Sequence, residues 1–259
     1  MKTFKLTAVV IAAIAALQCT AGCGKKDEKK SDDTANVSTT EAATSGFDGN
    51  AYYDKVMSAI EKQEVSKDAP QLSTLGEPVT PEEGSDESNL GAYRLSSNGV
   101  KLYYNSEEFS DNLMLTLEQY FLSFPANDYT KYTSCVFPSY IDEMGAFLEK
   151  DYSYDLKTSF AKQCVSLASR MNGDYKITRI RLEKPEQYTE GVDNLENYFK
   201  SLDDVFGKSY YEQVKGESDN IVDACFYVIG EDANGNETPI ISGYEIVFAE
   251  KDGRFYTFG

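Results

Sequence analysis

Histidine and tryptophan are absent from this sequence of 259 residues, and these absences restrict the functions that it can have. Without histidine, the protein cannot contain a Ser-His-Asp triad, a Cys-His pair or a zinc site with imidazole ligands. Basic residues are also scarce, because 25 Lys and Arg accompany 43 Asp and Glu and give a formal net charge of −18. Since nucleic-acid binding needs a basic surface, we expect no nucleic-acid partner.

Aromatic residues, in contrast, are plentiful. The chain has 19 Tyr and 14 Phe, and 41% of its residues are hydrophobic. This composition provides enough apolar surface for a core and excludes a wholly disordered chain. The length allows one or two domains.

The first 22 residues have the pattern of a secretory signal peptide. Lys2 and Lys5 precede an uncharged, mostly aliphatic run from Leu6 to Leu17. This run is shorter than the roughly 20 apolar residues of a membrane-spanning helix, but it suits the apolar core of a signal peptide.

Thr20-Ala21-Gly22-Cys23 follows directly and resembles the lipobox of bacterial lipoproteins, although that motif usually has Leu at the position of Thr20. The resemblance implies cleavage before Cys23, acylation of Cys23 by chains such as palmitate, and attachment to the outer, extracytoplasmic face of the cell membrane. Two alternatives are ordinary signal cleavage near Ala21, which would release a soluble secreted protein, and a cytoplasmic protein that buries the apolar segment.

The composition after Cys23 predicts three further segments. Residues 23–49 comprise the lipidated Cys and a polar, flexible tether, whose 26 residues after Cys23 would span about 30 Å. Residues 50–90 contain a short amphipathic helix and then an acidic, proline-containing linker or surface loop. Residues 91–259 are expected to form one α+β domain.

Hydrophobic periodicity predicts that helices come first in this domain and strands follow. Asn98-Gly99 predicts a turn between two strands, and Asp252-Gly253 predicts a terminal hairpin. The expected helices cover 50–63, 111–125, parts of 129–145, 155–171 and 194–206, and the expected strands cover 93–95, 100–104, 175–182, 221–229, 240–249 and 255–258. We therefore expect helices packed on a curved antiparallel sheet.

Three stretches, MNGDYKITRIRLEKPEQ, ENYFKSLDDVFG and the terminal EKDGRFYTF, together with the element order, resemble the nuclear transport factor two-like cone over roughly residues 110–259. The family includes isomerases, dehydratases, cyclases and many non-catalytic binding domains. The resemblance therefore implies a pocket between helices and sheet, but it does not select a reaction.

Two functional hypotheses remain. The favoured one is a non-catalytic module of the cell envelope that binds a small molecule or an envelope protein, and the alternative is a small carboxylate-dependent isomerase, dehydratase or hydrolase. Asp223 and Glu245 are the acids that the sheet offers, but the strand alternation predicts that both point to solvent. We therefore predict no catalytic residue, and we expect no cofactor or metal.

Adjacent tyrosines are candidate ligand contacts or core-edge residues, namely Tyr52-Tyr53, Tyr103-Tyr104 and Tyr210-Tyr211. The loop from Asp232 to Glu237 is similar to the start of a calcium loop, but its glycine is misplaced for an EF-hand, so a hairpin turn is favoured.

The cysteines after Cys23 are Cys135, Cys164 and Cys225, which allow at most one internal disulfide. Cys135 and Cys164 could pair if their helices are adjacent, but buried free thiols are favoured. The sequence has no CxxC pair, which argues against thiol redox catalysis.

The lipid anchor leads to a first prediction. Cys23→Ser removes the thiol that accepts the acyl chains, so the variant should be released from the membrane fraction or remain unprocessed. Membrane fractionation and the electrophoretic mobility of the product measure this. Normal processing with detergent-dependent membrane retention would contradict the assignment of Cys23.

Overall fold

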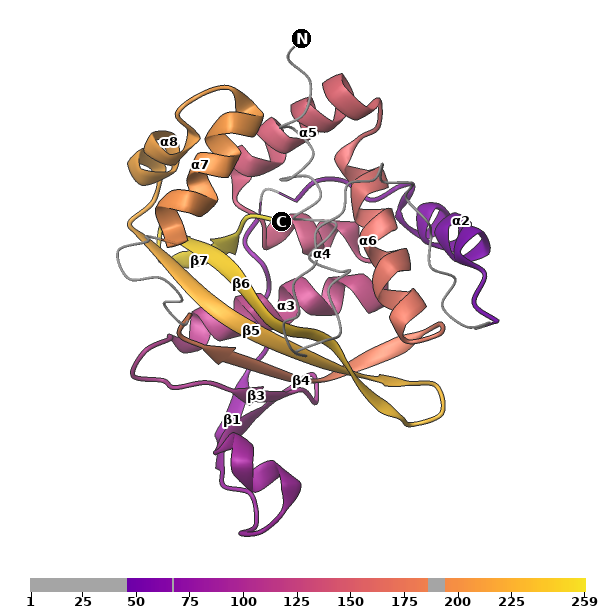
Figure 1. Cartoon of the computed structure of the whole chain (residues 1–259), viewed down its shortest axis with the longest axis vertical. Coiled ribbons are helices and arrows are strands. Elements are labelled where there is room, and N and C mark those ends of the chain that lie inside the picture. Colours follow the sequence, from indigo (N-terminus) through magenta and orange to yellow (C-terminus); the bar gives the residue numbers. More distant parts are fainter. Residues whose placement is uncertain (1–45, 67, 186–193) are drawn as a thin grey trace, which may run out of the picture.

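The computed structural model describes residues 46–66, 68–185 and 194–259, which form two layers. Seven α-helices of these residues lie mainly on one face of a seven-stranded sheet (Figure 1). The α+β fold class predicted from the sequence is confirmed.

The order of elements places most helices before the longest strands. The helices are α2 (Gly49–Ile60), α3 (Asp111–Ala126), α4 (Tyr129–Ser134), α5 (Pro138–Tyr152), α6 (Leu156–Arg170), α7 (Asn194–Phe206), α8 (Tyr210–Glu217) and a 3₁₀ helix, η1 (Asp86–Leu90). The strands are β1 (Leu75–Val79), β2 (Tyr93–Ser96), β3 (Lys101–Tyr103), β4 (Tyr175–Glu183), β5 (Asn220–Asp232), β6 (Glu237–Lys251) and β7 (Arg254–Thr257).

The strands are ordered in the sheet as they are in the sequence, from β1 to β7. All neighbouring pairs are antiparallel except β3 and β4, which run parallel. The expectation of a purely antiparallel sheet is therefore wrong. A long crossover makes the parallel pair possible. Helices α3 to α6 lie between these two strands in the sequence, and they return the chain to the end of the sheet at which β3 begins.

Local sequence signals determine several element ends. Ser110 and Asp155 accept hydrogen bonds from backbone amides at the starts of α3 and α6, as N-cap residues do. α6 is followed by Asn172 at φ 57°, and the β6–β7 turn has Asp252 and Gly253 at φ 53° and 72°. Positive φ at both central positions is typical of a type I′ hairpin turn, so the predicted terminal hairpin is confirmed.

Strand β6 is long and irregular. Its pairing with β5 shifts where Ile240 and Gly243 are inserted, and Gly243 has φ +67°. Each insertion is a β-bulge, which increases the local twist of the sheet. β7 pairs only with Phe248–Lys251, so the rest of this β6 edge has no strand beside it in the described part of the chain.

Residues 50–90 contribute directly to the packed structure. Val56 and Ile60 of α2 are fully buried, and Lys55 forms an ion pair of 2.7 Å with Asp174 beside α6. The segment expected to be a linker contains β1, which pairs with β2 at the edge of the sheet. The residue pattern does not predict β1, because this strand contains Pro78 and leaves most of its side chains exposed.

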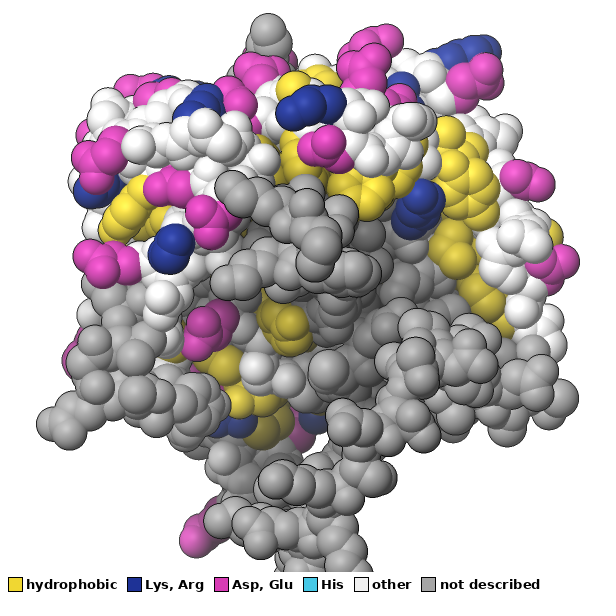
Figure 2. All heavy atoms as spheres, turned by 45° about the horizontal axis from the view of Figure 1, so that its top comes forward, with side chains coloured by type: hydrophobic (Ala, Val, Ile, Leu, Met, Phe, Trp, Pro, Cys, Tyr) yellow, Lys and Arg dark blue, Asp and Glu magenta, His cyan; other side chains and the backbone are white. Residues whose placement is uncertain are grey.

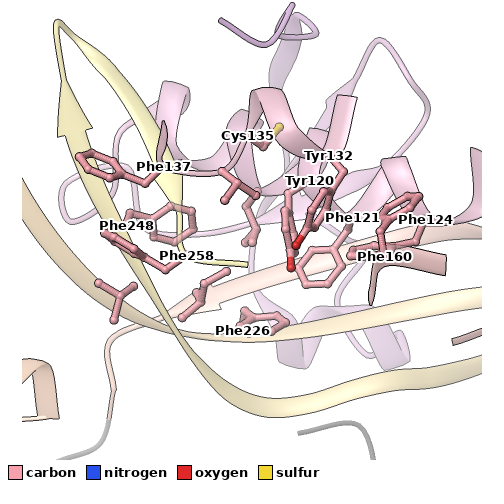
Figure 3. Close-up of a cluster of buried hydrophobic side chains, with 14 of the residues drawn as sticks. Tyr120, Phe121, Phe124, Tyr132, Cys135, Phe137, Phe160, Phe226, Phe248 and Phe258 are labelled. Carbon is pink, nitrogen blue, oxygen red and sulfur yellow. The ribbon is translucent and has the colours of Figure 1, made fainter. Parts of the chain in front are cut away.

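Aromatic side chains dominate the core between the layers (Figure 3). Phe258, directly after β7, has its ring centroid 5.3 Å from that of Phe137 and 5.2 Å from that of Phe199. Phe255, from the other side of β7, is also buried.

A carboxylate is buried among these apolar groups. Glu118 of α3 is 0% exposed and accepts hydrogen bonds from the hydroxyls of Ser73 and Ser96. The Asn98 amide also donates to it, at 3.3 Å. Glu118 therefore joins α3 to the chain before β1 and to the β2–β3 hairpin, and these donors compensate for the loss of water.

This carboxylate leads to a stability prediction. Glu118→Ala leaves the buried Ser96 hydroxyl and the partly buried Ser73 hydroxyl without their charged acceptor, so it should lower the free energy of unfolding by about 3 kcal/mol. Urea unfolding followed by circular dichroism measures the change. Glu149→Ala, the same substitution at an exposed position of α5, should change stability little. Equal effects of the two variants would contradict this role of Glu118.

Candidate functional site

A cavity of about 390 Å³ lies between the helices and the sheet. Each surrounding element contributes side chains to its wall, including Tyr120 from α3, Tyr140 from α5, Leu167 from α6, Leu202 from α7 and Phe226 from β5. This volume lies in the range of small-molecule pockets. Most of the lining side chains are hydrophobic, so the cavity suits a ligand with an apolar body.

Tyrosine hydroxyls provide much of the polarity of this wall. Tyr120 and Tyr140 are buried, and Tyr198 of α7 is partly exposed. Burial raises the pKa of each hydroxyl well above its usual value, and neighbouring tyrosines raise it further. Tyr120 lies beside Tyr132, with their ring centroids 5.5 Å apart (Figure 3). At neutral pH these groups are therefore uncharged hydrogen-bonding hydroxyls.

Glu245 has the only charged side chain among the described residues that line the cavity. It is exposed, as predicted, yet it borders the cavity, and the Asn194 amide donates to its Oε1 at 3.1 Å. Burial raises the pKa of Glu245, and the charge of Asp223 raises it further. Asp223 itself is partly buried on β5 and does not line the cavity.

A smaller cavity, of 140 Å³, lies beside Arg179, Arg181 and Tyr103. Arg179 forms ion pairs with Glu237 at 2.5 Å and Glu87 at 3.5 Å. Arg181 also pairs with a glutamate of its own strand. Because these cations are already paired, the larger cavity is the better candidate for a ligand site.

None of the three cysteines in the described residues, Cys135, Cys164 and Cys225, forms a disulfide bond. Cys135 and Cys164 are buried, whereas Cys225 is partly exposed on β5. Burial raises the pKa of Cys135 to about 12 and also raises that of Cys164. The thiolate is the reactive form of cysteine, so Cys135 and Cys164 are poor nucleophiles and poor metal ligands at neutral pH.

The adjacent tyrosines do not line the large cavity. In each pair one member is buried and the other is partly exposed, the buried ones being Tyr52, Tyr103 and Tyr210. These pairs therefore pack at the edges of the core. The loop after β5 is the expected hairpin turn, in which the Asp232 carboxylate accepts hydrogen bonds from the Asn234 and Asn236 amides.

Cys23 lies outside the described residues, so the structure does not bear on the lipid attachment site. In the described ranges, no helix is long and apolar enough to cross a membrane. The same residues contain no group of three or more His, Cys, Asp or Glu arranged to hold a metal ion.

Comparisons of the chain with protein-family models, with curated proteins and with solved structures found no match.

No pattern in the sequence distinguishes the tyrosines that line the cavity from other tyrosines. Tyr120 lies on the predicted apolar stripe of α3, where it is indistinguishable from a core residue. Tyr140 and Tyr198 follow 20 and 78 positions later on other helices. Only the packing of these helices brings the three hydroxyls to one cavity, and no spacing in the sequence predicts this.

The neutral tyrosines lead to a prediction about alkaline stability. Unfolded tyrosines ionise near pH 10, whereas the buried ones keep their protons to a higher pH. The unfolded state therefore loses protons first, and the free energy of unfolding should fall above about pH 10, by about 1.4 kcal/mol per pH unit for each such tyrosine. With no histidine, stability should change little from about pH 6 to 8, above which the unfolded thiols of Cys135 and Cys164 begin to ionise while the buried ones keep their protons.

Urea unfolding across this pH range, together with the tyrosinate absorbance of the folded protein, measures both effects. Ionisation of all tyrosines near pH 10 without loss of the fold would contradict the burial of these hydroxyls.

Proposed function

We propose that this chain is a lipid-anchored protein on the outer face of the cell membrane, and that its α+β domain is a non-catalytic binding module of the cell envelope. The anchor proposal rests on the apolar run of residues 6–17 and on the lipobox-like sequence that ends at Cys23. The acidic balance of the chain supports a domain that stands away from anionic lipid headgroups and binds its ligand in the surrounding medium.

The single observation that carries the binding proposal is the cavity of about 390 Å³ with an apolar, tyrosine-containing wall. Tyrosine combines a large apolar ring with a polar hydroxyl, so it can cover a ligand and also orient it. A small molecule, or an apolar side chain of an envelope protein, fits this chemistry.

We also propose that the fold is a variant of the nuclear transport factor two-like cone. Support comes from helices that cover one face of a twisted sheet, from a cavity between the two layers and from the closing β6–β7 hairpin (Figure 1). The parallel β3–β4 pair is a departure from the antiparallel sheet that the resemblance implies.

A carboxylate-dependent isomerase is the second candidate, and one observation favours it. Glu245 borders a cavity that also contains neutral tyrosine hydroxyls, and burial raises the pKa of this carboxyl. A carboxylate base combined with hydroxyl donors can move a proton next to a carbonyl group. However, Glu245 is exposed, and a catalytic carboxylate usually needs a more enclosed place to be strongly activated.

A larger side chain on α7 that fills the cavity tests the binding proposal. Ser201 of α7 lines the cavity and is partly exposed, so Ser201→Trp should fill it without removing a core side chain. Lys200→Trp places the same indole on the exposed side of α7 and is the matched control. Titration with Nile red, an uncharged apolar dye, should give saturable fluorescence that Ser201→Trp weakens at least about tenfold, or about 1.4 kcal/mol.

Circular dichroism of both variants verifies that they fold. Failure of the wild-type protein to bind the dye saturably would contradict the proposal, as would equal binding by the Ser201 and Lys200 variants. Because the chain has no tryptophan, the new indole also reports on its own surroundings.

A further inference from the structure

The described residues that line the large cavity carry negative charge only. Glu245 is its only charged lining residue in the described part of the chain, and no lysine or arginine belongs to that lining. The Asn194 amide holds Oε1 of this carboxylate at 3.1 Å and thereby limits where the charge lies. The described lining of the cavity therefore presents one negative charge and no positive charge to a bound ligand.

The aromatic wall of the cavity is also suited to a positively charged ligand. Phe258 lies at the centre of a group of rings, with ring centroids 6.0 Å from Tyr140 and 6.2 Å from Tyr198. All three residues line the cavity. The faces of aromatic rings carry partial negative charge and attract cations, including ammonium groups.

The net negative charge of the protein also favours cationic ligands. The whole chain carries a net charge of −18, although acidic and basic side chains are interspersed on the face drawn in Figure 2. A strongly negative protein raises the local concentration of cations and lowers that of anions. Small organic cations would therefore be favoured over anions of the same shape even before they reach the cavity.

We propose that the large cavity binds amphipathic organic cations, with the apolar body of the ligand against the tyrosine and phenylalanine wall and its ammonium head paired with Glu245. This inference rests on the proposed function, because it names the ligand class of the same cavity. A carboxylate-bearing ligand would instead meet Glu245 without a compensating cation. An uncharged ligand would keep the apolar contacts and lose the ion pair.

Three small molecules with one body test this ligand class. 4-Phenylbutylamine, 4-phenylbutanol and 4-phenylbutyrate share a phenylalkyl chain and differ in their cationic, neutral and anionic heads. In displacement of Nile red from the full-length protein, the amine should bind about tenfold more tightly than the alcohol, and the carboxylate should bind most weakly. Glu245→Gln should remove the ion-pair part of this preference, so the affinity for the amine should fall several-fold toward that for the alcohol, and the affinity for the alcohol should stay unchanged.

Glu250→Gln is the matched control, because it removes the same charge from the same strand at a position that does not line the cavity. It should preserve the preference for the amine.

Saturable Nile red binding with equal affinities for amine and alcohol would overturn the cation proposal but leave the cavity as a binding site. Equal losses of amine binding in the Glu245 and Glu250 variants would assign the preference to overall charge and also overturn it. Absence of Nile red binding would overturn the proposed function itself, and the cation proposal with it.

Discussion

The hydrogen bonds of Thr257 connect the end of the sheet to the helical layer. Its backbone amide donates to the Cys135 carbonyl and its carbonyl accepts from the Phe137 amide, each at 2.8 Å. Its hydroxyl donates to the Val247 carbonyl at 3.2 Å. β7 is thus held between β6 and the α4–α5 connection, and Phe258 is directed into the aromatic core (Figure 3). The aromatic wall of the cavity depends on this placement.

The structure combines a closely packed aromatic wall with modest chemical reactivity. The tyrosine hydroxyls near the cavity are held in the neutral form by burial, and the buried thiols are held as thiols for the same reason. Glu245 is the exception, because it keeps contact with solvent while it borders the cavity. This distribution agrees with the proposed binding module, since recognition of a ligand needs shape and a fixed charge.

The sequence predicts those parts of the fold that depend on neighbouring residues. The helix predicted over 155–171, the strand predicted over 175–182 and the Asp252-Gly253 turn depend on local signals, and all are present in the structure. β1 and α8 are missed, because β1 is largely exposed and contains a proline, and α8 is short. Glu118 is missed because its partners lie before β1 and in the β2–β3 hairpin, and the cavity is missed because its tyrosines come from three helices. Such features depend on contacts between segments that are distant in the sequence.

The bulged strand β6 has a further consequence for how copies of this protein meet one another. An unpaired sheet edge presents backbone groups to which a second chain can add a strand, and such encounters become more frequent as the concentration of the protein rises. Here Ile240 and Gly243 interrupt the regular ladder, Pro239 lacks an amide proton, and Arg170 occupies the Ile240 carbonyl at 2.6 Å. A regular intermolecular ladder along Glu237–Val247 is therefore disfavoured, which protects the protein from edge-to-edge aggregation at high local concentration.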